Sequence, residues 1–350
     1  SDVYKRQILS FVFLLSCSSI VTNLNENSWA ESVIKKMTLR EKIAQMMVYR
    51  MNMHYVNFEN KDWKELIQLI ETDGIGIIHI WFGDVGSSLT TLNFLQQKSK
   101  LPILVEADIE SGLGRRYNGS VRLPPMMAIA ATGNSYYAYE AGRISAEESR
   151  AVGIHFNLAP VVDVNNNPKN PIINTRSFGE VPDSVQKYSK DFIKGLKDFG
   201  MLTTAKHFPG HGDTETDSHS ALAMIPSDST RLWNIELPPF RHAIEAGVDA
   251  VMIAHVSAPD FQRHSEVPAS LSSFWIQDIL RKEMSFNGAV ITDAMGMGGI
   301  IKNYSDDYAI VETIKAGSDI IIQNDRLSHF IDVIENCLLY TSDAADDDHC

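Results

Sequence analysis

Short apolar runs alternate with amphipathic stretches along most of the chain. The apolar runs cover residues 43–51, 74–81, 101–108, 153–164, 201–208, 248–256, 288–293 and 318–323. Stretches with helical periodicity follow most of them, at 62–72, 87–97, 135–151, 185–199, 233–246, 272–284 and 308–316. Apolar runs without alternation indicate strands that are buried on both faces, as they are in a parallel sheet.

This order predicts a (β/α)8 barrel, formed as a single catalytic domain over residues 27–337. About eight strand–helix units in about 300 residues match the size of that fold. An open, doubly wound sheet is the alternative. Polar residues stand at the end of nearly every predicted strand, namely Asp108, Asp163, Lys206, His207, His255, Asp293 and Gln323. A barrel gathers all strand ends at one mouth, whereas an open sheet uses mainly its switch point, so we favour the barrel.

Composition and charge narrow the classes of protein. The chain has 350 residues, of which 44% are hydrophobic and 21% charged, as in ordinary globular proteins. A net charge of −13 argues against a nucleic-acid partner. The three cysteines, Cys17, Cys337 and Cys350, are too few and too terminal for a disulfide framework. No glycine-rich phosphate-binding motif is present in the sequence.

The two ends differ from the middle. Residues 8–16 are a short apolar run after two basic residues, too short to span a bilayer and typical of a secretory signal. The run ends in Leu-Leu-Ser-Cys, which resembles a lipobox, so we expect a membrane lipid anchor on Cys17; a plain cleaved signal is the alternative. Either predicts a cell-envelope location. Residues 1–7 and 338–350 resemble translated adaptor sequence, and we leave them out of the fold prediction. Residues 27–46 read as amphipathic helix, with Thr38 and Glu41 spaced as a capping box.

The segment 206–219, KHFPGHGDTETDSH, concentrates candidate chemistry in the loop expected after the fifth strand. One interpretation is a metal site made of His207, His211, Asp213 and His219, although Pro-Gly at 209–210 prevents a helix that would align them. A second is a general acid/base pair, because Asp217 in a tight loop can orient the imidazole of His219. A polar loop that satisfies its own hydrogen bonds is the third.

Three further segments carry candidate site residues. Asp293 ends an apolar strand, where a carboxylate can act as a nucleophile, stabilise positive charge or cap the next helix. Asp108 leaves the third strand in VEADIESGLGRR, which ends with Arg116; carboxylates and arginines there bind sugar hydroxyls or form a surface ion-pair cluster. Arg176, in NTRSFG after the fourth strand, is a ligand or a solvated surface charge.

Together these motifs resemble glycoside hydrolase family 3, and in particular its bacterial β-N-acetylglucosaminidase branch. The resemblance rests on KHFPGHGDTETDSH, RSFG, the Asp-x-Glu-x-Gly strand end, ITDAMGM and the opening MTLREKIAQMM, and it covers about residues 27–334. The sequence departs from the family at Ser111, where a glycine is usual, and in the glycines Gly296, Gly298 and Gly299, which predict a flexible loop after Asp293.

The resemblance implies roles for individual residues. Asp293 matches the family's nucleophile, His219 its acid/base and Asp217 the partner of that histidine. The positions that match the binding of N-acetylglucosamine in the first subsite are Asp108, Arg116, Arg176, Lys206 and His207. A retaining double displacement follows, which requires no metal and no cofactor.

Several alternatives stay open. Within the family they are a β-glucosidase or β-xylosidase and an N-acetylglucosaminide phosphorylase, since a neutral histidine acid/base tolerates phosphate as the acceptor. Outside it they are a catalytically silent sugar-binding barrel and the metal-dependent hydrolase. Peptidoglycan fragments and chito-oligosaccharides both fit the expected carbohydrate substrate.

Overall fold

The computed structural model describes residues 29–343, apart from 55, 56, 58, 227, 228, 263, 264 and 324. The expected signal segment and the Cys17 anchor lie outside the described residues. Contacts divide the chain into two compact units, Ser1–Lys42 and Ile43–Cys350. No helix in the described part is long and apolar enough to cross a bilayer.

The described part of the first unit is helical. Residues 29–34 form a helix, and α2 (Leu39–Met46) begins two residues after a turn. The backbone N–H of Glu41 donates to Thr38 Oγ1 at 3.2 Å, and the backbone N–H of Thr38 donates to Glu41 Oε2 at 3.0 Å. These reciprocal bonds confirm the predicted capping box.

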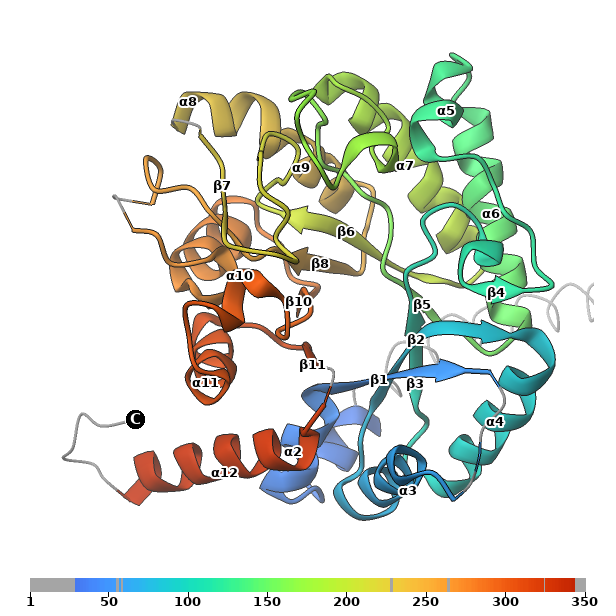
Figure 1. Ribbon diagram of the computed structural model, residues 1–350, viewed down its shortest axis with the longest axis vertical. Helices are drawn as coiled ribbons and strands as arrows, with labels where there is room; N and C mark the ends of the chain where they lie inside the picture. The colour runs from blue at the N-terminus through green and yellow to red at the C-terminus, as the bar shows by residue number, and fades with distance from the viewer. Residues whose placement is uncertain are drawn as a thin grey trace, which may run out of the picture. The chain divides into compact units, whose positions relative to one another are not determined.

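The second unit is a parallel barrel with its strands inside and its helices outside (Figure 1). The barrel strands are β1 (Met47–Met53), β2 (Ile77–Asp84), β3 (Leu104–Ala107), β5 (Phe156–Asn157), β6 (Leu202–Phe208), β8 (Ala250–Ile253), β10 (Ala289–Thr292) and β11 (Ile321–Gln323). Their order is β10-β8-β6-β5-β3-β2-β1-β11, and all of these pairs are parallel. A parallel bridge between Ile291 and Ile320 joins the two ends of this series. The predicted (β/α)8 barrel is confirmed.

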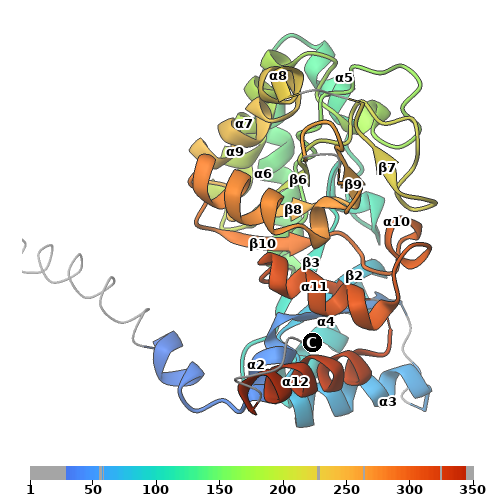
Figure 2. The same ribbon diagram turned by 90° about the vertical axis from the view of Figure 1, so that its left-hand side faces the viewer.

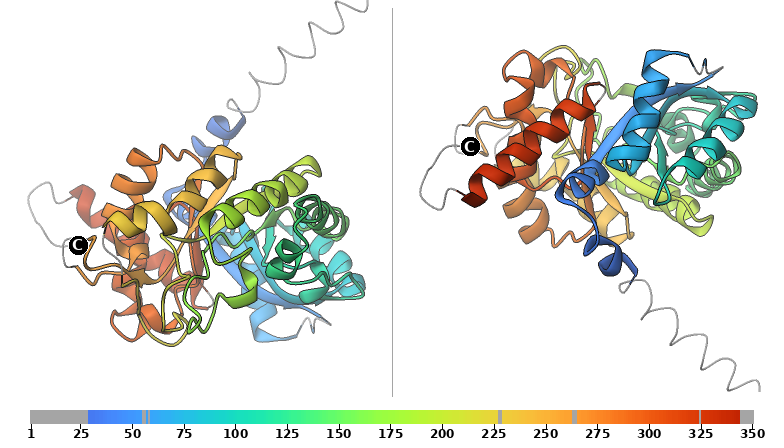
Figure 3. Two further views of the ribbon diagram at one scale, coloured as in Figure 1. Left: turned by 90° about the horizontal axis from the view of Figure 1, so that it is seen from above. Right: turned by 90° about the horizontal axis from the view of Figure 1, so that it is seen from below.

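The helices follow the strands as the periodicity predicts. They are α3 (Lys61–Gln68) with η1 (Leu69–Asp73), α4 (Val85–Lys98), α5 (Met126–Ala131), α6 (Tyr136–Ala151), α7 (Pro182–Asp198), α8 (Ser229–Arg231) with η4 (Leu232–Glu236), α9 (Pro238–Glu245), η6 (Phe274–Glu283), α10 (Gly298–Ile301), α11 (Asp306–Ala316) and α12 (Leu327–Asp343). Figure 2 shows α7 and α9 outside β6 and β8, and Figure 3 shows the same arrangement from above and below. Helix α12 continues past residue 337, where we expect the domain to end.

Apolar side chains fill the barrel interior. The cluster there consists of Val48, Ile77, Phe156, Leu158, Ala250, Met252, Ile291 and Ile322. These residues are contributed by six of the strands or by the residue directly after one, so the barrel is a packed core and not a pore. The polar strand ends are thereby confined to one rim.

The fourth strand is shorter than the predicted run 153–164. Only β5 is regular, because Pro160 has no N–H to donate to a ladder. The chain beyond it still follows its neighbour, since Val162 N–H donates to the carbonyl of Lys206 at 2.7 Å. Asp163 therefore reaches the rim beside β6.

Three short strands and three short helical turns lie in the connections at the rim. Strand β4 (Tyr117–Asn118) pairs with the end of β2, and β7 (Ala223–Met224) pairs with β9 (Val256–Ser257). The β7–β9 pair joins the segment after β6 to the segment after β8. The short helical turns η2 (Leu113–Arg115), η3 (Asn174–Arg176) and η5 (Ala269–Leu271) lie in the connections.

Candidate active site

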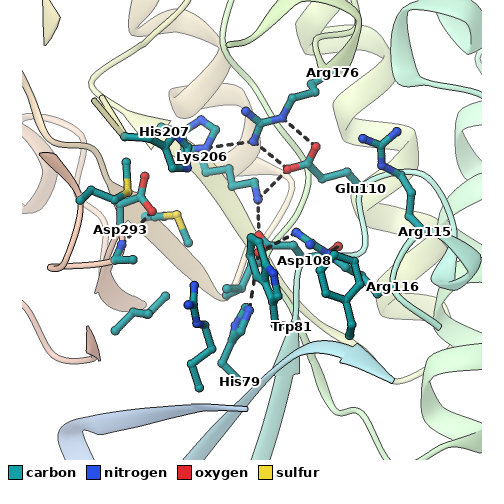
Figure 4. A pocket seen from close by; sticks show the side chains of 18 of the residues that line it. His79, Trp81, Asp108, Glu110, Arg115, Arg116, Arg176, Lys206, His207 and Asp293 are labelled. Atoms are coloured by element: carbon teal, nitrogen blue, oxygen red, sulfur yellow. Dashed lines mark hydrogen bonds and ion pairs between the residues drawn. The ribbon is translucent and has the colours of Figure 1, made fainter. Parts of the chain in front are cut away.

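A cavity of about 700 Å³ opens at the carboxyl-terminal rim of the barrel. Seven of the eight predicted site residues line it, namely Asp108, Arg116, Arg176, Lys206, His207, His219 and Asp293. The eighth, Asp217, contacts His219. Figure 4 shows the side chains of the cavity converging from β2, β3, β6 and the segment after β10.

One wall is a cluster of paired charges, Asp108, Glu110, Arg116, Arg176 and Lys206, which we call the ion-pair cluster. Lys206 Nζ lies 2.6 Å from Asp108 Oδ1 and 2.8 Å from Glu110 Oε1. Arg176 binds Glu110 with two parallel bonds, Nε to Oε2 at 2.9 Å and Nη2 to Oε1 at 2.8 Å. Arg116 Nη2 lies 3.2 Å from Asp108 Oδ2. These fixed contacts set the orientation of both carboxylates.

The ion-pair cluster holds its members charged despite burial. Burial opposes ionisation of Asp108 and Glu110, but Lys206 beside Asp108 and Arg176 beside Glu110 outweigh it and keep both pKa values below their ordinary range. Burial alone would lower the pKa of Lys206, whereas Asp108 and Glu110 raise it. Arg176 is therefore no solvated surface charge, the alternative that its local sequence left open.

His207 is fixed at the end of β6 by charged neighbours on both sides. Its Nδ1 lies 2.7 Å from Asp163 Oδ2, and its Nε2 lies 3.3 Å from Arg176 Nη2. Since an arginine can only donate, Nε2 accepts and Nδ1 carries the proton. Burial disfavours the Asp163 carboxylate, yet His207 and the backbone N–H of His211 keep its pKa lowered. Lys206 and His207 thus lie within β6, inside the predicted apolar run 201–208, and the loop begins after Phe208.

Asp293 follows β10 directly and faces the same cavity. Its Oδ1 accepts the backbone N–H of Ala294 at 2.8 Å, and His255 Nε2 lies 3.0 Å from the carbonyl of Ala294. Burial favours the neutral acid, but His207, His255 and that backbone N–H outweigh it, so the pKa of Asp293 is lowered. Asp293 caps no helix, because α10 begins at Gly298 with Met297 at its N-cap.

Asp217 and His219 lie on the segment 209–222 between β6 and β7, which we call the dyad loop. His219 Nδ1 lies 2.8 Å from Asp217 Oδ1, and the backbone N–H of His219 donates to the same oxygen at 2.9 Å. The side chain of His219 is 56% exposed and that of Asp217 33%. Partial burial alone would raise the pKa of Asp217. The two contacts with His219 lower it by more, so the net shift is downward. His219 lines the cavity, and no described residue forms a hydrogen bond with its Nε2, so this atom can meet a ligand.

Glycines after Asp293 hold the dyad loop against this segment. The N–H groups of Gly298 and Gly299 donate to the carbonyls of His219 and Ser218, both at 3.0 Å. A Cβ at position 298 would lie 2.4 Å from the carbonyl oxygen of Ser220. These glycines permit a close backbone approach, a role that the predicted loop flexibility did not include.

The four residues of the alternative metal site do not converge. His211 is buried, with Nδ1 2.6 Å from Thr214 Oγ1 and Nε2 2.9 Å from Ser218 Oγ. Asp213 binds Arg231 at 2.6 Å, and His207 binds Asp163 and Arg176. No three His, Cys, Asp or Glu side chains of the described residues are placed to hold a metal ion.

Sequence reasoning missed part of the cavity. It overlooked His79 and Trp81 on β2, which line the cavity, and Glu106 on β3, which lies behind it, and it did not count Glu110 among the site residues. The two-residue period of a strand was the available signal: His79 and Trp81 share one face of β2, and Glu106 shares the face of Asp108.

The geometry defines a class of protein. A closed parallel barrel whose acidic and basic side chains converge at the carboxyl-terminal mouth is the architecture of (β/α)8-barrel enzymes. Comparison with known proteins then gives the family. The family described as "Glycosyl hydrolase family 3 N terminal domain" matches residues 38–344, so the chain belongs to this family, and the resemblance drawn from the motifs is confirmed.

Individual relatives agree with that assignment. The chain is 28% identical to the "Beta-N-acetylglucosaminidase/beta-glucosidase" of Cellulomonas fimi over 84% of its length and 52% of that protein. It is 33% identical to the "Beta-hexosaminidase" of Vibrio cholerae El Tor Inaba N16961, over 78% of this chain and 81% of the relative. A solved family 3 β-N-acetylglucosaminidase from Paenibacillus sp. str. FPU-7 superimposes with a TM-score of 0.80 at 37% identity, over 88% of this chain and 59% of that one. The chain thus spans about half of the Cellulomonas relative.

Proposed function

We propose that this chain carries the catalytic barrel of a retaining β-N-acetylglucosaminidase that releases terminal β-linked N-acetylglucosamine. One observation carries the proposal. Asp293, whose pKa is lowered, and His219, whose Nδ1 is held by Asp217, line the same cavity opposite two fixed and charged carboxylates. The relatives, which are named β-N-acetylglucosaminidases and β-hexosaminidases, support the N-acetyl sugar as the substrate.

The proposed reaction has two displacements. Asp293 attacks the anomeric carbon while the imidazolium of His219 gives its Nε2 proton to the departing glycosidic oxygen, which leaves as an alcohol. The neutral imidazole then takes a proton from water as that water attacks the anomeric carbon and releases the Asp293 carboxylate. Asp217 keeps the Nδ1 proton in place in both steps. Two inversions give net retention.

The ion-pair cluster is the proposed binding subsite. Asp108 and Glu110 present ionised oxygens that accept sugar hydroxyl protons, and Arg116, Arg176 and Lys206 present donors. Because each carboxylate is already paired with a cation, neither has to be desolvated as an isolated charge when a sugar binds. The subsite is therefore formed before the substrate arrives. The lipid anchor on Cys17, the cell-envelope location and the peptidoglycan-derived substrate belong to this proposal as expectations from the sequence.

The test compares aryl β-N-acetylglucosaminide with aryl β-glucoside, each with and without a chelator. We expect turnover of the N-acetyl sugar well above that of the glucoside, unaffected by chelator. Turnover of the glucoside alone would replace the proposal with a β-glucosidase, which the double name of the Cellulomonas relative also allows. Activity lost on chelation would favour a metal hydrolase. Binding of the sugar without turnover would indicate a silent barrel.

A second arm repeats the assay with inorganic phosphate and identifies the released sugar. Free N-acetylglucosamine at all phosphate concentrations supports hydrolysis. Accumulation of the sugar 1-phosphate would make the chain a phosphorylase, because phosphate would then replace water in the second displacement.

A further inference from the structure

A buried imidazole and carboxylate lie behind the ion-pair cluster. His79 on β2 and Glu106 on β3 are register partners across the two strands. His79 Nδ1 lies 3.2 Å from Glu106 Oε1, and His79 Nε2 lies 3.7 Å from Asp108 Oδ2. The side chain of His79 is 3% exposed and that of Glu106 0%. The three groups therefore form a chain from the barrel interior to the cavity, and Figure 4 shows His79 directed at Asp108.

Glu106 is an unusual residue for a barrel interior. Its second oxygen, Oε2, has no hydrogen-bond partner, and burial raises its pKa. A buried carboxyl group with a single partner is costly, so packing alone does not account for it. Among the residues that the structure describes, the polar contact of the Glu106 side chain is with His79.

That contact selects the protonation of His79. If Glu106 is ionised, Nδ1 donates to it, and the Asp108 carboxylate beside Nε2 favours an N–H there as well. If Glu106 is neutral, it donates its proton to Nδ1, and Nε2 carries the remaining proton. In both cases an N–H is directed at the Asp108 carboxylate. The opposite tautomer would set a bare nitrogen against that carboxylate, which is repulsive.

We propose that Glu106 and His79 form a positioning pair. The pair keeps the Nε2–H of His79 directed at the Asp108 carboxylate and so helps to orient the group that receives the substrate sugar. This inference rests on the proposed function for the identity of the ligand. Asp108 then faces three N–H groups, since Lys206 holds Oδ1 at 2.6 Å, Arg116 holds Oδ2 at 3.2 Å, and His79 Nε2 lies 3.7 Å from Oδ2. Removal of the His79 N–H leaves Oδ2 to Arg116 alone and holds the carboxylate less firmly.

The proposal predicts an effect on binding and not on chemistry. Within the described residues, neither His79 nor Glu106 forms a hydrogen bond or ion pair with Asp293 or His219, so the two displacements should proceed normally once the sugar is bound. The informative variant is H79L/E106L, because it replaces both polar groups with apolar ones and leaves no buried group unpaired. The conservative variant is E106Q, whose amide can still donate to Nδ1 and preserve the tautomer.

The experiment measures KM and kcat on aryl β-N-acetylglucosaminide, and Ki for free N-acetylglucosamine. For H79L/E106L we expect KM and Ki to rise about tenfold, with kcat within about threefold of wild type. E106Q should keep KM within about threefold. Gln262→Leu removes a buried hydrogen bond to Trp275 outside the cavity and is the matched control; it should lower thermal stability without changing KM.

A second readout does not depend on turnover. The ¹⁵N spectrum of histidine-labelled protein, assigned by loss of the His79 signals in H79L/E106L, reports which ring nitrogens carry protons. A protonated Nε2 supports the pair, and a bare Nε2 overturns it. Unchanged KM and Ki in the folded double variant would also overturn it. If the wild type turned over no sugar, the proposed function would fail while the spectrum still decided the pairing.

Discussion

The two sides of the cavity are built in opposite ways. The ion-pair cluster is buried and rigidly cross-linked, with each carboxylate bound to at least two cations from other elements. The two dyad residues, Asp217 and His219, are more exposed and pair with each other. His219 is 56% exposed, and its one side-chain partner lies two residues away on the same loop.

This difference separates binding from proton transfer. Charges in the ion-pair cluster are interdependent, so a change there affects stability and ligand binding together. The dyad works near water, which lets its histidine exchange protons between the two displacements. Backbone bonds from Gly298 and Gly299 hold the dyad loop beside the segment after Asp293, and the side chain of Asn170 donates to three carbonyls of the same loop.

The largest expected effect comes from Asp293, which lies between the two sides. Asp293→Asn removes the attacking oxygen while changing the shape of the side chain little. We expect kcat to fall by at least about 10³-fold, with an unchanged circular dichroism spectrum and binding of N-acetylglucosamine retained. Wild-type-like turnover would remove Asp293 as the nucleophile.

The next effect tests the dyad loop. His219→Ala removes the proton donor, so we expect kcat/KM to fall about 10²- to 10⁴-fold for substrates with poor leaving groups. Activated aryl leaving groups need less protonation and should lose far less. The measurement is a series of aryl substrates of graded leaving-group pKa. A steeper dependence than in the wild type supports the acid role, and an unchanged slope contradicts it.

The ion-pair cluster should respond in stability as well as in activity. Lys206→Met leaves Asp108 and Glu110 with one cation fewer in a buried site. We expect a loss of about 3 kcal/mol in the free energy of unfolding, measured by urea denaturation, together with loss of sugar binding. Lys194→Met, which breaks an exposed pair with Asp198, is the control and should do neither. Equal effects of the two substitutions would show that the ion-pair cluster is not cooperative.

A smaller effect should follow from moving the dyad loop without altering its side chains. Gly298→Ala brings a methyl group against the carbonyl of Ser220 and displaces His219 from Asp293. We expect about a tenfold loss of kcat at nearly constant KM. Gly86→Ala is the matched control, because its Cβ would meet only Asp84 Oδ1 at 3.7 Å. A kcat equal to that of Gly86→Ala would mean that the loop tolerates the shift.

The last prediction concerns the pH dependence of stability. Burial, opposed by Asp163, lowers the pKa of His211 from 6.5 to about 4. The unfolded chain therefore binds more protons between pH 4 and 6.5, so His211 makes the folded state lose stability as pH falls through that window, by about 3 kcal/mol in total. The raised pKa of Glu106 has the opposite effect on stability. Above pH 4.5, the ordinary pKa of a glutamate, this buried carboxyl group makes the folded state lose stability as the pH rises. Denaturation of His211→Gln at several pH values should show a shallower dependence than wild type, and parallel curves would contradict the assignment.

Much of the fold could be predicted because buried parallel strands leave a plain signal. Runs such as GAVITD and SDIIIQ are apolar on both faces, and the structure forms β10 and β11 within them. The limits of β5 could not be predicted, because hydrogen bonding around Pro160 depends on the neighbouring strand. The order of the strands around the barrel is the sequential one that a (β/α)8 barrel implies.

The site was predictable where chemistry is concentrated in one segment. The 206–219 segment stands out by composition alone, whereas Asp293 is identified by its place at the end of an apolar run and by the ITDAMGM motif. His79 and Glu106 do not, because each is a single polar residue in an apolar run, and only the register between β2 and β3 shows that they meet. The pairing of Arg176 with Glu110 was equally hidden, since the two residues lie 66 positions apart.

The most direct test of the central claim is to trap the sugar on the enzyme. Wild-type protein is incubated with a fluorinated N-acetylglucosaminyl fluoride that slows the second displacement, and its intact mass is measured. We expect a mass increase of one sugar residue, mapped by peptide analysis to Asp293 and absent in Asp293→Asn. A sugar attached to another residue, or rapid turnover of the reagent with inversion and no adduct, would contradict the account.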